Sequence, residues 1–326
     1  MLPLSSFRVE SPSNMAQLAD CIKKASQKIK IMSGGTDLIP NLKHRLYDIE
    51  HIISLQNIQE LDGVKFENGK IYIGANLKLC EVISNDVLEN YCPALKEAAS
   101  HIASPQIRNM ATVGGNICLD TRCLYFNQSE FWRSALGYCL KKDGTVCHVI
   151  KTGKRCVAAS SNDLVSVLLA LKARLCIWSP GHEYEIDLDD FYTANGLKNN
   201  KLGDGEIVSK VYFEAVKNKC TGFAKLRHRQ SIDFSLISVG VSYMLEHERV
   251  RDLTVVVNAL VAKPKVLVFP QLEHTTLDNR LINEVALQSA QKCHPQSNIC
   301  DDPKWRKEMV KIYVERAFEN SLKNRK

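Results

Sequence analysis

Four cysteines in the middle of the chain have the residue type and spacing to hold a metal ion or an iron–sulfur centre. Cys123, Cys139, Cys147 and Cys156 follow one another as C-x15-C-x7-C-x8-C. Four thiolates suit either Zn²⁺ or an iron–sulfur cluster. The four form none of the paired C-x₂₋₄-C knuckles typical of zinc sites, and wide spacing around a loop fits a cubane at least as well. These residues alone leave open a cluster, a structural zinc ion or unliganded core cysteines.

Two glycine turns earlier in the chain are suited to a phosphate. One is Ser33-Gly34-Gly35-Thr36-Asp37-Leu38, after a short apolar run, and the other is Thr112-Val113-Gly114-Gly115-Asn116. A glycine turn after a strand exposes successive backbone N–H groups in a concave nest that binds anions. A single Gly-Gly pair is more often a plain tight turn, but two in one α/β region indicate a dinucleotide pyrophosphate. A phosphate site that leads into four thiolates suggests two redox cofactors side by side.

Composition places the chain among ordinary globular proteins. It has 326 residues, of which 45% are hydrophobic and 24% charged, with a formal net charge of +7. This length fits two or three packed units. The apolar runs are far shorter than the roughly 20 residues of a membrane span, and the N-terminus has no export signal. We therefore expect a cytoplasmic protein with no membrane partner. Lys and Arg are spread without a nucleic-acid motif, so we expect no nucleic-acid partner.

The total of twelve cysteines is high, but it does not indicate a disulfide framework. The cytosol keeps thiols reduced, so the cysteines outside the central group are expected to be small core hydrophobes. These are Cys21, Cys80, Cys92, Cys176, Cys220, Cys293 and Cys300.

Alternating strands and helices must position the glycine turns and the cysteines. Apolar spacing predicts strands over 29–32, 51–55, 70–75, 174–178, 183–188 and 206–214, and helices over 14–27, 79–91, 93–103 and 163–173. These elements predict two α/β lobes, over about 1–58 and 59–218. Alternation over 235–245 and 252–261, followed by helices near 279–291 and 303–322, predicts an α+β domain with an antiparallel sheet over 219–326.

Five motifs resemble those of the flavin subunits of molybdenum hydroxylases, and they occur in the same order. They are SGGTDLIP at 33–40, SPQIRNMATVGGNI at 104–117, SSNDL at 160–164, KLRHRQSIDFSLISVGVSYML at 225–245 and WRKEMVKIYVERAF at 305–318. The resemblance covers essentially the whole chain. It implies an α+β protein with a two-lobed FAD-binding domain of the PCMH type over 1–218, followed by the family's C-terminal domain over 219–326.

The resemblance also implies which residues hold FAD. The pyrophosphate would lie on the first glycine turn, the flavin would face the second, and two further polar side chains would contact the cofactor. These residues are Ser33, Gly34, Gly35, Thr36, Asp37 and Leu38; Thr112, Gly114, Gly115 and Asn116; and Asp163 and Lys225. Two alternatives stay open, namely Asp163 as the N-cap of a helix over 164–172 and Lys225 as a surface lysine. The sequence does not say whether His228, Arg229 and Asp233 touch flavin.

The segment 118–156 departs from the general family pattern, in which the chain passes almost directly to the SSNDL-like motif. It resembles the extra loop of flavin subunits in the 4-hydroxybenzoyl-CoA reductase branch, which carries a [4Fe-4S] cluster. This resemblance implies that Cys123, Cys139, Cys147 and Cys156 bind such a cluster and that Cys118 belongs to the flavin motif. A ligand set that includes Cys118 or His148 is the alternative.

No group of residues for substrate chemistry is evident, and we assign no catalytic residue. The sequence has no H-x-x-x-H site and no G-x-S-x-G elbow. The chain therefore looks like an electron carrier within a larger oxidoreductase. The resemblance implies three partners: a large molybdopterin-binding subunit, a small [2Fe-2S] subunit and a ferredoxin-like electron carrier. The alternatives are a xanthine- or aldehyde-type flavin subunit, a self-sufficient FAD oxidoreductase and a non-redox subunit with structural zinc.

The cysteine loop is also basic, which bears on the electron carrier. Lys141, Lys142, Lys151, Lys154 and Arg155 stand against a single acid, Asp143, within 141–155. Surface charge of one sign speeds encounter with an oppositely charged partner. An acidic carrier such as ferredoxin would dock there, although a merely solvated loop has the same composition.

Overall fold

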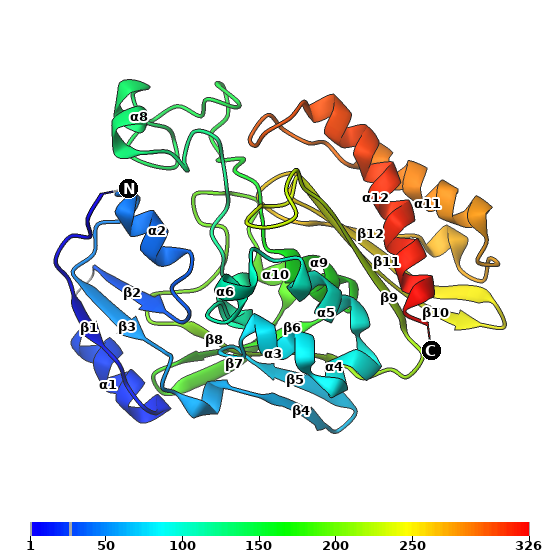
Figure 1. Cartoon of the computed structure of the whole chain (residues 1–326), viewed down its shortest axis with the longest axis horizontal. Coiled ribbons are helices and arrows are strands. Elements are labelled where there is room, and N and C mark those ends of the chain that lie inside the picture. Colours follow the sequence, from blue (N-terminus) through cyan, green and yellow to red (C-terminus); the bar gives the residue numbers. More distant parts are fainter. Residues whose placement is uncertain (1, 26–27, 326) are drawn as a thin grey trace.

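The computed structural model describes residues 2–25 and 28–325, which form three sheets with helices between and around them (Figure 1). The first sheet is parallel, and its strands in spatial order are β1 (Arg8–Glu10), β3 (His51–Ser54) and β2 (Ile29–Met32). Helices α1 (Met15–Lys24) and α2 (Leu38–Lys43) connect them. Ile53 packs with Leu18 of α1 on one face, and Ile52 packs with Leu42 of α2 on the other. Successive strand residues thus face opposite helices.

The second sheet has five strands, and all its neighbouring pairs are antiparallel. In spatial order they are β4 (Val64–Glu67), β5 (Lys70–Gly74), β8 (Ile207–Glu214), β6 (Arg174–Ser179) and β7 (His182–Asp187). Along the chain these strands come as the hairpins β4–β5 and β6–β7 and as the single strand β8, with helices between them. The prediction of a second α/β lobe named no strand pairs. The β4–β5 hairpin turns at Asn68 and Gly69, which have φ of 50° and 75° as tight hairpin turns require.

The helices beside the second sheet include four within the predicted ranges and three short ones that were not predicted. The first four are α3 (Leu79–Ser84), α4 (Asp86–Tyr91), α5 (Pro93–Ser100) and α9 (Asp163–Ala170), and the short ones are α6 (Pro105–Arg108), α7 (Val113–Ile117) and α10 (Leu188–Phe191). The helix predicted over 79–91 is broken at Asn85, whose extended backbone ends α3 and whose side chain caps α4. The helix predicted over 14–27 ends at Lys24, and residues 26–27 lie outside the described part of the chain.

The third sheet forms the C-terminal part of the molecule and has helices on both faces. Its antiparallel strands are β12 (Lys265–Val268), β11 (Arg249–Asn258), β10 (Ile237–Glu246) and β9 (Cys220–Leu226), of which β9 and β12 were not predicted. Helices α11 (Asn279–Lys292) and α12 (Pro303–Lys323) cover one face (Figure 1), and α5 and α9 pack on the other. No helix in the described ranges is long and apolar enough to cross a membrane.

Two glycines explain how closely these helices approach the third sheet. A Cβ at Gly222 would lie 2.0 Å from the carbonyl oxygen of Ala317 in α12, and one at Gly240 would lie 2.3 Å from that of Ser166 in α9. Only glycine fits at either position. The core between the second and third sheets therefore forms around α9, which is buried along its whole length.

The insertion over 118–156 packs against the first lobe and carries helix α8 (Glu130–Ala135) beside α2 (Figure 1). The buried guanidinium of Arg133 donates hydrogen bonds to the backbone carbonyls of His44, at 2.7 Å, and Arg45, at 3.3 Å. These carbonyls lie at the C-terminal end of α2, where a cation is favoured. The insertion is therefore anchored on the lobe that carries the first glycine turn.

Candidate functional site

A large cleft of about 1080 Å³ lies between the first glycine turn, the second sheet's helices and strand β9. Typical small-molecule sites have volumes of roughly 300–1,000 Å³, so this cleft suits a large ligand such as a dinucleotide. Eleven of the twelve residues predicted to contact FAD line it: Ser33, Gly34, Gly35, Thr36, Asp37, Leu38, Thr112, Gly115, Asn116, Asp163 and Lys225. Residues far apart in sequence thus meet at one cleft, which we call the flavin cleft.

The first glycine turn presents free donors to this cleft. Within residues 2–25 and 28–325, no hydrogen bond uses the backbone N–H groups of residues 34–37. Gly35 has a φ of +69°, and a Cβ at Gly34 would lie 1.9 Å from the carbonyl oxygen of Met110. Glycine is required at both positions, for the turn and for its close approach to the second lobe. Successive free N–H groups in such a turn fit an anionic group.

The second glycine turn is different, because its N–H groups are used inside the protein. The amides of Val113 and Gly114 donate to the carbonyls of Leu77 and Ala75, and that of Gly115 donates to Thr112 Oγ1. Gly114 was expected to face the flavin, but it does not line the cleft. It packs on Ala75 instead, and a Cβ added at Gly114 would lie 2.7 Å from the Ala75 Cβ. The lack of a side chain at Gly114 therefore serves close packing between two segments of the second lobe.

Asp163 and Lys225 form a buried ion pair at the wall of the flavin cleft. Lys225 Nζ lies 2.6 Å from Asp163 Oδ2. The Lys225 side chain is 2% exposed and that of Asp163 is 4% exposed. Lys225 is therefore not a surface lysine. Asp163 is the first residue of α9, whose N-cap is Asn162, so the alternative of an N-cap role is also wrong. Asp233 lines the cleft as well, and its carboxylate accepts from the backbone N–H groups of His228 and Arg229.

Arg122 is a cleft residue that sequence reasoning missed. Its guanidinium pairs with the Asp37 carboxylate and lies 4.2 Å from the ring centroid of Phe234. Burial lowers the pKa of Arg122 to about 10. All three residues line the flavin cleft. The pairing joins positions 85 residues apart, and the only sequence signal was a basic residue next to Cys123.

The four central cysteines line a second, smaller cavity, which we call the cysteine cavity. Cys139, Cys147 and Cys156 are buried, and Cys123 is partly buried. The other lining residues are mostly apolar: Tyr125, Phe126, Leu140, Lys141, His148, Val149, Val157 and Ala158. Cys118 lines the flavin cleft instead. The insertion therefore folds so that thiols spread over 34 positions surround one space.

Backbone N–H groups and burial define the surroundings of these thiols. The backbone N–H groups of Ile150 and Ala158 lie 3.5 Å from the sulfurs of Cys147 and Cys156, and such hydrogen bonds tune iron–sulfur centres. Burial raises the pKa of the Cys123 thiol to about 11, and it also raises that of Cys156. Metal binding would release these protons. In the described part of the chain, no three His, Cys, Asp or Glu side chains are arranged to hold a single metal ion.

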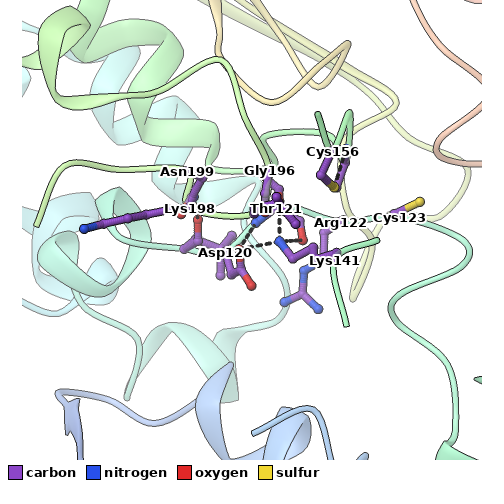
Figure 2. Close-up of polar contacts among 12 residues, drawn as sticks. Asp120, Thr121, Arg122, Cys123, Lys141, Cys156, Gly196, Lys198 and Asn199 are labelled. Carbon is purple, nitrogen blue, oxygen red and sulfur yellow. Dashed lines mark hydrogen bonds and ion pairs between the residues drawn. The ribbon is translucent and has the colours of Figure 1, made fainter. Parts of the chain in front are cut away.

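The basic loop is less uniformly exposed than its sequence suggested. The Lys141 side chain is only 5% exposed and pairs with Asp120, so its expected place on a docking surface is wrong (Figure 2). Lys142 pairs with its neighbour Asp143. Lys151, Lys154 and Arg155 are exposed. The positive surface of the insertion is therefore carried by the residues just before Cys156.

Comparison with known proteins agrees with the cleft. Residues 5–213 match the family described as the FAD binding domain in molybdopterin dehydrogenase. Over 97% of both chains, the sequence is 24% identical to the xanthine dehydrogenase FAD-binding subunit of Escherichia coli O157:H7. It is 23% identical to the glyceraldehyde dehydrogenase medium chain of Sulfolobus acidocaldarius, over 88% of this chain and 89% of that one.

Solved structures show the same fold. A chain of the carbon monoxide dehydrogenase from Hydrogenophaga pseudoflava superposes with a TM-score of 0.80 and 19% identity, over 100% of both chains. A chain of quinoline 2-oxidoreductase from Pseudomonas putida 86 also superposes with a TM-score of 0.80, at 16% identity and over 99% of both chains. The family match covers most of the chain, and the relatives are subunits of dehydrogenases. The chain therefore belongs to the FAD-binding subunits of the molybdenum hydroxylases, a family of oxidoreductases.

Proposed function

We propose that this chain is an electron-transfer subunit that holds FAD and a [4Fe-4S] cluster, most similar in role to the flavin subunit of 4-hydroxybenzoyl-CoA reductase. One observation carries the proposal: four cysteines of a single insertion line one cavity next to the flavin cleft. Bound FAD supplies one- and two-electron chemistry. The first glycine turn would bind its pyrophosphate through free N–H groups, while Asp163 and Lys225 would position its polar groups.

The neighbouring flavin cleft favours a cluster over zinc, because a redox cofactor beside the cysteine cavity gives an iron–sulfur centre a role that a zinc ion would lack. The shared cavity by itself suits either centre. An apolar wall that includes Phe126 and Val157 would shield such a centre from water.

The relatives support a role inside a larger complex. Their names describe FAD-binding subunits and medium chains of dehydrogenases. The partners of this chain are a large molybdopterin-binding subunit and a small [2Fe-2S] subunit. These names also support a second candidate, the flavin subunit of a xanthine- or aldehyde-type dehydrogenase. The cysteine cavity separates the two, because only the first candidate gives it a redox role.

A ferredoxin-like carrier is the third proposed partner, and the exposed part of the insertion is its docking surface. Lys151, Lys154 and Arg155 supply positive charge, and Phe131 of α8 is 83% exposed. Charge reversal at Lys151 and Lys154 should slow electron uptake from an acidic ferredoxin and flatten its salt dependence. The control is Lys65→Glu, at an exposed lysine of strand β4, which should leave uptake unchanged. Equal rates in all variants would remove the docking surface.

The ligand set is tested by replacing one cysteine at a time. Cys147→Ser should lose most of the bound iron but keep FAD, because Cys147 lines the cysteine cavity only. Cys118→Ser is the matched control, since Cys118 lies five positions before Cys123 and lines the flavin cleft. It should keep its iron. Equal iron content in the two variants would contradict the proposed ligands, and bound zinc in place of iron would contradict the cluster.

A further inference from the structure

The ammonium group of Lys141 lies between the two proposed cofactor sites. Lys141 lines the cysteine cavity. Its Nζ donates to Asp120 Oδ1 and to Thr121 Oγ1, each at 2.6 Å (Figure 2), and lies 4.6 Å from the ring centroid of Phe126. Asp120 in turn lines the flavin cleft, where its other oxygen accepts a hydrogen bond from Tyr47 at 2.9 Å. One ion pair therefore spans the wall between the cleft and the cavity.

The surrounding structure fixes the position of this charge. The Lys141 side chain is 5% exposed, and Thr121 is fully buried. Thr121 Oγ1 also contacts the carbonyl of Gly196, at 3.4 Å, and the amide of Gly196 donates to the carbonyl of Cys156. A Cβ at Gly196 would lie 2.9 Å from the sulfur of Cys156. The network that holds Lys141 thus also packs against a proposed cluster ligand.

We propose that Lys141 and Asp120 are paired positioning residues that set the reduction potential of the cysteine-bound centre. One-electron reduction adds one negative charge to that centre. A fixed cation at the cavity wall stabilises the added charge, and the carboxylate behind it opposes this effect. Low local polarity strengthens both contributions, because neither charge is fully solvated. This inference rests on the proposed cluster and goes beyond it, since it assigns a role to two residues that are not ligands.

Replacing either member of the pair should shift the midpoint potential of the centre, in opposite directions for the two residues. Lys141→Met removes the cation and should make the midpoint potential of the centre more negative. Asp120→Asn leaves the cation uncompensated and should make it more positive. Each change is expected to be roughly tenfold in the equilibrium constant for reduction, about 59 mV for one electron. Lys141→Arg keeps the charge and should stay near the wild-type potential. Lys65→Met, at an exposed lysine of strand β4, is the control.

The experiment is an anaerobic dithionite titration of the whole chain, followed by electron paramagnetic resonance of the reduced centre. Opposite shifts in Lys141→Met and Asp120→Asn, with little shift in Lys65→Met, support the inference. Shifts of the same sign in the two variants, or an unchanged potential in Asp120→Asn, overturn it. The Asp120→Asn result alone is enough to overturn it if Lys141→Met fails to fold. Wild-type protein without iron would instead refute the proposed cluster, so the two failures are distinguishable.

Discussion

The buried pair of Asp163 and Lys225 allows a quantitative test of the flavin-cleft wall. Lys225 Nζ also donates to the carbonyls of His101, at 3.0 Å, and Asp233, at 3.1 Å, while Asp163 also accepts from Ser235. Lys225→Met removes the cation and leaves a carboxylate that is 4% exposed without a charged partner. Breaking a buried pair in this way costs about 3–5 kcal/mol of unfolding free energy.

A double-mutant cycle separates this pair from general packing damage. Asp163→Asn alone should also destabilise the chain, because it leaves the ammonium of Lys225 with carbonyl partners only. The double variant should lose less than the sum of the two single losses, with a coupling of about 1–3 kcal/mol. The assay is urea unfolding of the FAD-free chain, followed by FAD titration of each variant. We expect weaker FAD binding in both single variants.

The control for this cycle is a more exposed ion pair in the same chain. Lys263 and Asp189 lie 3.0 Å apart, with side chains 28% and 49% exposed. Lys263→Met should cost less than about 1 kcal/mol and leave FAD binding unchanged. Losses at Asp163 and Lys225 that add within about 0.5 kcal/mol would refute the reasoning, since they would show that the two charges do not interact.

Two further predictions concern single positions. Gly34→Ala places a Cβ 1.9 Å from the Met110 carbonyl oxygen, so it should weaken FAD binding at least tenfold. In the control variant Gly115→Ala the added Cβ meets only the Thr112 hydroxyl, at 3.0 Å, and FAD binding should weaken less. Equal FAD affinities of the two variants by titration would contradict this. Burial raises the pKa of Glu97 from 4.5 to about 7, so the folded chain loses stability as the pH rises through that interval. Glu97→Gln should therefore stabilise the folded chain by about 1 kcal/mol at about pH 8 but not at about pH 4. Equal unfolding midpoints of the variant and the wild type at the higher pH would contradict this.

Local patterns were enough to predict most elements, while the family resemblance supplied most residues of the flavin cleft. The motif at 33–38 follows a strand and forms a turn because glycine permits φ of +69° at Gly35, and this preference is readable from sequence. The strands β9 and β12 were not predicted, and their pairing partners lie in β10 and β11. Local patterns could not predict the antiparallel pairing of the second sheet either, since pairing depends on contacts distant in sequence.

Long-range charge pairing accounts for the other differences. Lys141 looked like part of a solvated basic run, yet it pairs with Asp120, and Arg122 pairs with Asp37 across 85 positions. No local pattern distinguishes a buried lysine from an exposed one when its partner lies elsewhere in the chain. Gly114 belongs to the same class, because its role depends on Ala75 of another segment. The differences from the prediction therefore arise where a side chain's surroundings depend on a partner far away in the sequence.

Cofactor analysis tests whether one chain holds both FAD and a [4Fe-4S] cluster. The chain is purified without oxygen, its iron, zinc and FAD are measured, and its visible spectrum is recorded before and after dithionite. We expect about four irons and one FAD per chain, with broad visible absorbance that bleaches on reduction. FAD without iron, or FAD with one zinc ion, would leave the flavin cleft in place and contradict the cluster.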